Sequence, residues 1–421
     1  MPAERRAIEV VADWVGMGGP TRMGWLHATP SRGKEIFSFE YDRAWLGSEA
    51  ALAVDPGLRL HRGPQHAPMG RDNFGVFLDS SPDRWGRVLM QRREAQRARV
   101  DKRREQTLRE SDYLLGVYDG HRLGGLRFRI EDGPFLDDNS DLASPPWTSL
   151  RELEQASLRL EQTGIEREPS YGKWLSMLIA PGRSLGGARP KASVIDTKKR
   201  LWIAKFPSHN DIDDIGAWES VAHALAHKSG VVVAEGERKR FGKKHHTFLS
   251  QRFDRTAAGG RIHFASAMTM LERQDGETGA SYIELAGVLT RHGAHVPRDL
   301  EQLWRRIVFF VCISNVDDHL RNHGFLLEQK GWALAPAYDM NPVAHGSGLT
   351  LNISETDNAQ DLELVLDIAK HFRVQARRAK KIVNEVRDAV REWRTEAKRA
   401  GITRAEQDRM TNAFRIADKR V

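Results

Sequence analysis

The segment Asn315–His323 carries residue types that suit phosphoryl transfer. Asp317 is followed five positions later by Asn322, between an expected apolar helix and an expected strand at 324–327. An Asp, four intervening residues and an Asn is the spacing of a kinase catalytic loop. There the carboxylate accepts the proton of a substrate hydroxyl, and the amide oxygen helps to hold Mg²⁺. We interpret Asp317 as a candidate catalytic base and Asn322 as a candidate metal ligand.

Two alternatives stay open for this segment. Asp and Asn also cap turns, so the same spacing arises without any catalytic role. Asp318 directly follows Asp317 and is a second carboxylate in the same loop. The spacing to Asn322 favours Asp317 as the base.

A further oxygen ligand is expected at Asp339. It stands in Pro336–Pro342, just past a predicted strand at 332–334. Mg²⁺ takes oxygen ligands and is commonly held by one or two carboxylates together with water. Asn322 and Asp339 together therefore predict a magnesium site. An Asp that merely opens a turn is the alternative for Asp339, and the two motifs considered together disfavour it.

Nucleotide binding is predicted from a Gly-rich segment, 182–191, which includes Gly186 and Gly187. Glycines let backbone N–H groups approach phosphate oxygens. The segment is not a Walker A loop, because Ala188 follows Gly187 where that motif has Lys. Taken alone the pattern favours a plain turn over a phosphate-binding loop.

Lys205 ends an apolar strand and Glu219 lies in the following helix. A kinase uses a strand lysine to contact the nucleotide phosphates and a helix glutamate to orient it. The alternative is a surface ion pair.

Composition and charge limit the other classes. The chain has 421 residues, one cysteine, a net charge of +8 and a pI of about 9.6. Cys312 is expected to be a buried core residue, and a single cysteine excludes a disulfide framework. His319 and His323 lack the pattern of a zinc motif, and no Gly-x-Ser-x-Gly elbow indicates a hydrolase. Basic clusters at 92–104 and 373–399 are read as solvated helix faces or as a footprint for an acidic partner or nucleic acid.

The periodicity predicts strands followed by helices. Strands are expected at 35–41, 112–130, 191–195, 200–206, 231–233 and 246–252, and helices at 84–109, 149–162 and 215–229 and beyond 281. Ser149 and Glu152 have capping-box spacing. The absence of an apolar run of about 20 residues or a signal-like N-terminus predicts a cytoplasmic protein that does not enter a membrane.

Several motifs resemble the HipA family of serine/threonine kinases, the toxins of bacterial type II toxin–antitoxin systems. The resemblance rests on their order and spacing along nearly the whole chain. The motifs are Phe39–Leu46, Leu78–Asp83, Leu115–Gly120, Ser184–Lys191, Ala204–Pro207, Gln251–Arg255, Asn315–Asn322 and Pro336–Pro342.

The resemblance implies an α+β, two-lobed protein-kinase-like fold. Its expected parts are an N-terminal α+β subdomain at 1–145, a kinase N-lobe with the Gly-rich loop at 146–256, and a helical C-lobe at 257–421. By position, it implies that Asp317 is the base, that Asn322 and Asp339 bind Mg²⁺, and that Lys205 contacts ATP.

The same resemblance implies regulation and partners. Ser184 matches a serine that family members autophosphorylate to switch themselves off, and Phe248-Leu249 matches the adenine-facing hinge. The expected partner is a helix-turn-helix, HipB-like antitoxin, through which DNA is contacted. The substrate is expected to be a protein, with an aminoacyl-tRNA synthetase as a family example. Arg189-Pro190 departs from the family pattern and is expected to alter the mobility of the Gly-rich loop.

Two other functions are consistent with the same residues. A small-molecule kinase of similar fold would phosphorylate a metabolite rather than a protein. A non-catalytic co-repressor would steer an antitoxin complex onto DNA, but it would not require Lys205, Asp317, Asn322 and Asp339 together.

Overall fold

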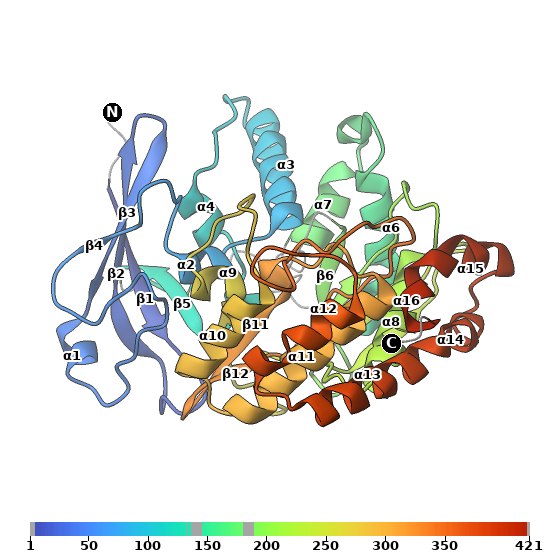
Figure 1. The fold of residues 1–421 in the computed structure, drawn as a ribbon. Helices are drawn as coiled ribbons and strands as arrows, with labels where there is room; N and C mark the ends of the chain where they lie inside the picture. Colours follow the sequence, from blue (N-terminus) through green and yellow to red (C-terminus); the bar gives the residue numbers. More distant parts are fainter. Residues whose placement is uncertain (1–4, 132, 136–144, 180–188, 419–421) are drawn as a thin grey trace. The chain divides into compact units, whose positions relative to one another are not determined.

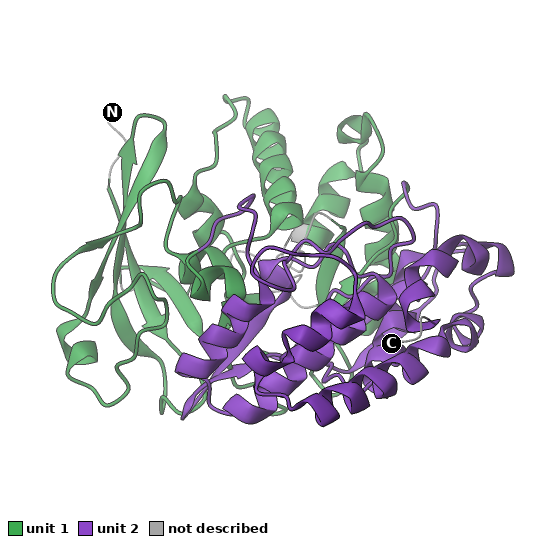
Figure 2. Cartoon of the chain, in the orientation of Figure 1, with its two compact units in different colours: residues 1–209, 254–272 green, residues 210–253, 273–421 purple. Residues whose placement is uncertain are grey.

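A computed structural model describes residues 5–131, 133–135, 145–179 and 189–418. The chain forms two compact units, each assembled from separate stretches of sequence (Figure 2). Unit 1 is Met1–His209 with Asp254–Glu272, and unit 2 is Asn210–Phe253 with Arg273–Val421. The predicted domain boundaries at 145 and 256 remain predictions. Ser184, Gly186 and Gly187 lie outside the described residues.

Unit 1 begins with an antiparallel sheet in the order β4-β3-β2-β1-β5 (Figure 1). Ile8, Leu26 and Phe39 stand opposite one another on neighbouring strands, and all three are buried. Such cross-strand apolar contacts form the buried face of this sheet. The strands are β1 (Arg6–Ala12), β2 (Thr21–Ser31), β3 (Lys34–Tyr41), β4 (Gln65–His66) and β5 (Leu126–Ile130), and a separate hairpin pairs β6 (Lys191–Ile195) with β7 (Leu201–Lys205).

The helices of unit 1 differ from the prediction in two places. The basic helix α3 ends at Val100 rather than at 109, where Lys102 adopts a positive φ of 51°. The predicted strand at 112–130 is wrong over most of its length, because only β5 is strand there. The helices are α1 (Arg43–Leu46), α2 (Gly75–Asp79), α3 (Arg84–Val100), α4 (Glu110–Leu115), α6 (Leu150–Leu160), α7 (Tyr171–Ile179) and α9 (Ala267–Met270), with short 3₁₀ turns at Asp119–His121, Trp147–Ser149 and Ile165–Arg167.

Helix caps explain part of this difference. The side chain of Asp112 accepts a hydrogen bond from the Arg109 backbone N–H at 2.8 Å, which helps to start α4. The predicted capping box at Ser149 is wrong, since the Ser149 side chain makes no capping bond. A capping box does begin α10 in unit 2, between Ser281 and Glu284.

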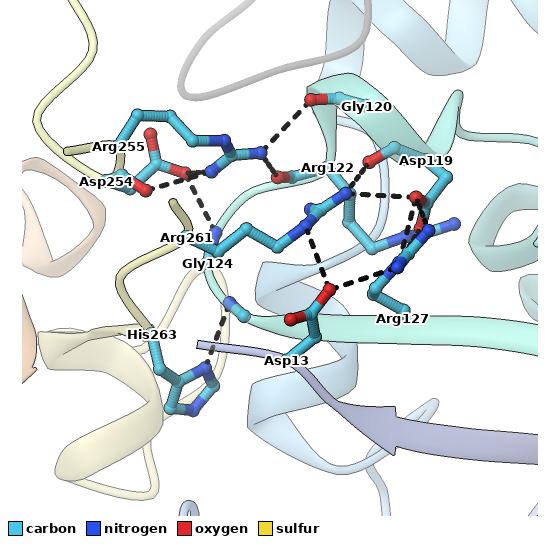
Figure 3. Close-up of polar contacts among 11 residues, drawn as sticks. Asp13, Asp119, Gly120, Arg122, Gly124, Arg127, Asp254, Arg255, Arg261 and His263 are labelled. Atoms are coloured by element: carbon cyan, nitrogen blue, oxygen red, sulfur yellow. Dashed lines mark hydrogen bonds and ion pairs between the residues drawn. The ribbon is translucent and has the colours of Figure 1, made fainter. Parts of the chain in front are cut away.

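The segment Asp254–Glu272 belongs to unit 1 through a network of arginines and aspartates (Figure 3). Asp254 accepts a hydrogen bond from Gly124 N at 2.9 Å and pairs with Arg255 at 2.6 Å. Arg261 pairs with Asp119 at 3.0 Å. These bonds hold the returning segment against the turn that precedes β5.

The same segment also carries β10 (Phe264–Ser266) and α9. Ser266 N and the Thr269 hydroxyl each donate to the Asp79 carboxylate at 2.7 Å. Burial raises the pKa of Asp79 to about 6, although these hydrogen bonds act to lower it.

Unit 2 consists of helices and two antiparallel hairpins, β8–β9 and β11–β12. Its central helix, α11, is buried along most of its C-terminal half and packs against α10, α13 and α16. Its strands are β8 (Gly236–Lys239), β9 (Thr247–Gln251), β11 (Gly324–Glu328) and β12 (Gly331–Leu334). Its helices are α8 (Ile215–Lys228), α10 (Tyr282–His292), α11 (Val296–Ile313), α12 (Leu362–Asp367), α13 (Ala376–Arg391), α14 (Trp393–Arg399), α15 (Arg404–Met410) and α16 (Arg415–Asp418), with 3₁₀ turns at Leu320–Asn322, Ala369–Phe372 and Thr411–Phe414.

Within the described residues, no helix combines the length and the apolar character needed to cross a membrane.

Candidate active site

The candidate catalytic loop, Asn315–Asn322, begins where α11 stops. Ser314 ends the helix with a left-handed backbone conformation, φ 50° and ψ 51°. The next residue returns a hydrogen bond from Asn315 N to Phe310 O at 3.0 Å. A left-handed residue followed by such a bond is a common helix termination, and it turns the chain sharply away from the helix axis.

Asp318 lies in the interior of unit 2. Its Oδ2 accepts a hydrogen bond from the Tyr282 hydroxyl at 2.5 Å and lies 2.7 Å from His323 Nε2. The side chains of Asp318 and His323 are both 0% exposed. Arg306 continues the chain of contacts, with Nη1 3.5 Å from His323 Nδ1 and Nη2 donating to Ala335 O at 2.8 Å. We call Tyr282, Arg306, Asp318 and His323 the buried network.

Burial sets the electrostatics of this network. It raises the pKa of Tyr282 well above its usual value of 10, and the nearby Asp318 adds to that effect. Burial lowers the pKa of Arg306 to about 10, against the opposing influence of Asp318. At neutral pH the tyrosine therefore donates its proton in a hydrogen bond and the arginine is charged. Because Asp318 is fully buried and bonded to Tyr282 and His323, the network anchors the loop to the interior of unit 2.

Asp317 has the opposite environment. It is exposed, and its carboxylate makes no hydrogen bond or ion pair to any described residue. Its backbone carbonyl accepts a hydrogen bond from Asn322 Nδ2 at 3.0 Å. This bond joins the two ends of the Asp-x₄-Asn motif.

Asn322 is 3% exposed, and its two amide atoms have different roles. Nδ2 is used in the bond to Asp317, whereas the buried Oδ1 has no hydrogen-bond partner among the described residues. A buried amide oxygen without a partner is costly unless a ligand satisfies it. The atom therefore fits an oxygen ligand of a cation such as Mg²⁺.

Asp339 follows β12 on the second candidate loop. Its φ of 57° is left-handed, a conformation that few residue types other than glycine adopt, Asp and Asn among them. Asn341 N donates to Asn315 Oδ1 at 2.9 Å, and the Tyr338 hydroxyl donates to Arg321 O at 2.7 Å. These two bonds hold the Asp339 loop beside the candidate catalytic loop.

The described residues include no group of three or more His, Cys, Asp or Glu side chains that would hold a metal ion. A site built from one amide and one carboxylate is not such a group. His319 and His323 form no zinc site there, since His323 belongs to the buried network.

The remaining predicted residues of unit 2 lie on α8 and β9. Glu219 is 4% exposed on α8, and Phe248 and Leu249 are buried in β9. The Phe248 ring lies 5.8 Å from that of His223.

Lys205 belongs to unit 1 and is half-buried at the end of β7. Its pairing with Glu219 remains a prediction. Lys191, opposite Lys205 in the hairpin, is buried and pairs with Asp83 at 2.9 Å.

Sequence reasoning missed the buried network. Tyr282 and Arg306 lie 36 and 12 positions before Asp318, on α10 and α11. The only local signal was the pair of adjacent aspartates with a histidine five positions after the second. That signal did not distinguish a structural aspartate from a catalytic one.

Residues 183–393 match a family model described as a HipA-like C-terminal domain, which spans half of the chain. A Haemophilus influenzae protein described as a "Putative kinase" is 26% identical over 184 residues, which are 39% of this chain and 53% of that protein. The chain therefore spans about half the length of this curated relative.

The fold is similar to HipA of Shewanella oneidensis MR-1, solved in a toxin–antitoxin complex with HipB and operator DNA. That similarity covers 97% of this chain and 95% of that one, with a TM-score of 0.63 and 15% sequence identity. The predicted α+β, kinase-like fold of the HipA type is confirmed.

Proposed function

The chain belongs to the family with a HipA-like C-terminal domain, and from this premise we propose that it is an ATP-dependent protein kinase acting on serine or threonine. The observation that carries the proposal is the environment of one loop. An exposed carboxylate without a partner, on Asp317, stands in the same motif as a buried amide oxygen without a partner, on Asn322.

In the proposed reaction Asp317 accepts the proton of the acceptor hydroxyl. The hydroxyl oxygen forms a bond to the γ-phosphorus of ATP as the bond from that phosphorus to the β,γ-bridging oxygen breaks, and ADP leaves. Asp317 suits this role because its carboxylate is exposed, whereas both His323 and Tyr282 contact Asp318. A positioned base of this kind accelerates proton transfer by about 10²–10⁴-fold.

Asn322 Oδ1 and the Asp339 carboxylate are the residues that would hold Mg²⁺. The ion would supply charge neutralisation for the phosphate oxygens. The bond from Asn322 Nδ2 to Asp317 O leaves Oδ1 as the amide atom without a partner among the described residues, and the Asn341–Asn315 bond joins the Asp339 loop to the candidate catalytic loop.

Lys205, Glu219, Gly186, Gly187, Phe248 and Leu249 are proposed to contact ATP or to support its site. Lys205 would bind the phosphates, and Phe248-Leu249 would lie at the adenine. Ser184 is proposed to be autophosphorylated and to lower activity, since a phosphate of about −1.5 to −2 charges beside the nucleotide phosphates is repelled.

The proposed biological role is a growth-arresting toxin of the cytoplasm. The Shewanella relative was solved with HipB and operator DNA, and a comparable helix-turn-helix antitoxin is the proposed partner here. A protein of the translation machinery, such as an aminoacyl-tRNA synthetase, is the proposed class of substrate.

The decisive experiment is transfer of radiolabelled phosphate from ATP into a cell lysate, with mass spectrometry of the labelled proteins. We expect one or a few labelled proteins modified on Ser or Thr, and no label with Asp317→Asn. Label in a metabolite and in no protein would replace the proposal with a small-molecule kinase. No transfer at all, with operator binding unaffected by Asp317→Asn, would favour a co-repressor.

A further inference from the structure

Most arginines of the first basic cluster are used inside unit 1. Past the end of α3, Arg103 pairs with Glu94 at 2.6 Å, and on α3 just before the cluster Arg87 pairs with Glu110 at 2.6 Å. The guanidinium of Arg92 donates to Leu160 O at 2.5 Å, and that of Arg99 to Glu166 O at 2.7 Å. These contacts show that the cluster mainly joins helices together.

Much of the C-terminal basic cluster is also paired. Arg378 contacts Glu301 at 2.6 Å and Arg394 contacts Asp408 at 3.1 Å. Arg399 contacts Glu396 at 2.6 Å. Carboxylates therefore neutralise a large part of the charge that the sequence places there.

The β8–β9 hairpin differs from both clusters. Arg238, Arg240, Lys243 and Lys244 lie within seven residues, and none of these four has a carboxylate partner among the described residues. Arg238 instead donates to Ser220 Oγ at 3.2 Å and to Arg399 O at 2.6 Å, and Arg240 donates to Lys243 O. We call these four residues the hairpin cations.

Two of the hairpin cations line a pocket of about 430 Å³ within unit 2. Its lining residues are Ser220, Gly236, Glu237, Arg238, Arg240 and His246. The one carboxylate of this lining, on Glu237, lies 3.6 Å from Lys239 Nζ. The pocket thus offers two guanidinium groups, an imidazole and a hydroxyl to a ligand.

Asp214 orients the imidazole of His246. The carboxylate lies 2.6 Å from His246 Nδ1 and accepts a bond from His246 N at 2.8 Å. Burial acts to raise the pKa of Asp214, but the bonds from His246 outweigh it and the pKa is lowered. The ionised Asp214 accepts a hydrogen bond from Nδ1, so Nε2 is the ring nitrogen left for a ligand in the pocket.

We propose that the β8–β9 hairpin binds the phosphate backbone of a nucleic-acid duplex, with one phosphate entering this pocket. Guanidinium groups match phosphate oxygens in a two-pronged geometry. Arg238 lies in β8 and Arg240 directly follows the last residue of that strand, and both line the pocket. B-DNA carries a phosphate at about every 3.4 Å of helix axis along each strand, so cations that lie close together can contact successive phosphates. Lys243 and Lys244, at the turn of the hairpin, would contact the neighbouring phosphates.

The test is fluorescence anisotropy with a short labelled DNA duplex of mixed sequence, titrated from about 50 to 200 mM KCl. Each lost phosphate contact changes the slope of log K against log salt by about 0.9. The variant R240Q/K243Q/K244Q should therefore have a slope shallower by about 2.7, with an unchanged melting temperature. Full-length protein is used throughout.

The matched control is R377Q/K380Q/K381Q on α13, which removes the same charge from exposed residues outside the pocket. Its slope should stay near that of the wild-type protein. If the slope of log K against log salt became equally shallow in both variants, binding would depend on overall charge, and the proposal would be wrong. The same holds if poly-glutamate of equal charge competes as well as unlabelled duplex, because the hairpin would then select an acidic protein.

Phosphotransfer is measured on the same variants. The hairpin proposal goes beyond the proposed kinase activity, and each can fail without the other. Reduced DNA affinity of R240Q/K243Q/K244Q with full phosphotransfer is the expected combination.

Discussion

Asp317 and Asp318 are neighbours in sequence and opposites in environment. Asp317 is exposed, and its carboxylate contacts no described residue. Asp318 is fully buried, and two side chains from other segments of unit 2 contact one of its oxygens. The same residue type therefore serves two different purposes at adjacent positions of one loop.

The contrast between Asp317 and Asp318 shows how one loop can be anchored by a buried carboxylate and still present an exposed carboxylate to a substrate. A buried carboxylate with one oxygen bonded to a tyrosine and a histidine contributes to stability. A carboxylate that is left without partners contributes little to stability and is free for a substrate. We expect mutations to separate these two contributions cleanly.

The largest expected effect is on catalysis. Asp317→Asn keeps the shape of the side chain but removes the proton acceptor, so phosphotransfer should fall by about 10²–10⁴-fold, or about 2.7–5.5 kcal/mol in activation free energy. The melting temperature should not change, because no contact of the carboxylate is lost. The measurement is initial rates of phosphate transfer. An active Asp317→Asn with an inactive, well-folded Asp318→Asn would reverse the assignment.

The next effect is on stability. Asp318→Ala leaves the Tyr282 hydroxyl and His323 Nε2 buried without their partner, and each buried polar group left unsatisfied costs about 1–3 kcal/mol. Unit 2 should unfold at lower urea concentration, whereas Asp317→Ala should unfold like the wild-type protein. Equal unfolding midpoints for the two alanine variants would contradict the comparison.

Tyr282→Phe probes one bond of the buried network. The change removes the 2.5 Å hydrogen bond to Asp318 and keeps the ring. Hydrogen bonds to charged groups contribute about 1.5–3 kcal/mol, so the free energy of unfolding should fall by about that amount. Urea unfolding measures it, and phosphotransfer at low temperature, where the variant stays folded, should remain near that of the wild-type protein.

The same tyrosine predicts a pH dependence. In the folded protein the pKa of Tyr282 is well above 10, whereas in the unfolded chain it is near 10. Above pH 10 the unfolded chain therefore loses a proton that the folded chain retains. Stability should fall as the pH rises, by up to about 1.4 kcal/mol per pH unit from this group. Tyr282→Phe should lose stability less steeply over this range, and parallel curves for the two proteins would count against the shift.

The smallest effect concerns Asp339, whose left-handed backbone suits glycine better than aspartate. Asp339→Gly adopts this conformation without strain, so the free energy of unfolding should change by no more than about 1 kcal/mol, while Mg²⁺-dependent nucleotide affinity falls. Asp339→Asn is the control, since Asn also tolerates this conformation. Calorimetry with and without Mg²⁺ measures the affinity. Unchanged Mg²⁺-dependent affinity in both variants would remove Asp339 from the proposed metal site.

Local patterns predicted the elements on which the site is built. The hairpin at 191–205 and the helix beginning at Ile215 were placed within one or two residues, because strong apolar runs and turn residues define them. The strand predicted at 112–130 failed because a capping aspartate and several glycines have helical and turn roles there that periodicity does not report.

The site was predictable only in part for a related reason. Spacing alone placed Asp317, Asn322 and Asp339 on two loops, and the bond from Asn341 to Asn315 shows that these loops meet. Which aspartate is buried depends on Tyr282, which lies 36 positions away on another helix. Residues so far apart in the sequence are not linked by the periodicity of any single helix or strand, so periodicity cannot predict their contact.

The return of Asp254–Glu272 to unit 1 has a consequence for synthesis of the chain. Asp79 bonds to Ser266, which lies 187 positions later in the sequence. At about 5–20 residues per second, the ribosome adds those residues over roughly 10–40 s. Throughout that interval the buried end of α2 lacks its hydrogen-bond donors, and the first part of unit 1 has emerged without the segment that completes it. Nascent chains stalled before residue 254 should therefore be cut by protease near Asp79, whereas chains stalled well beyond 272 should resist.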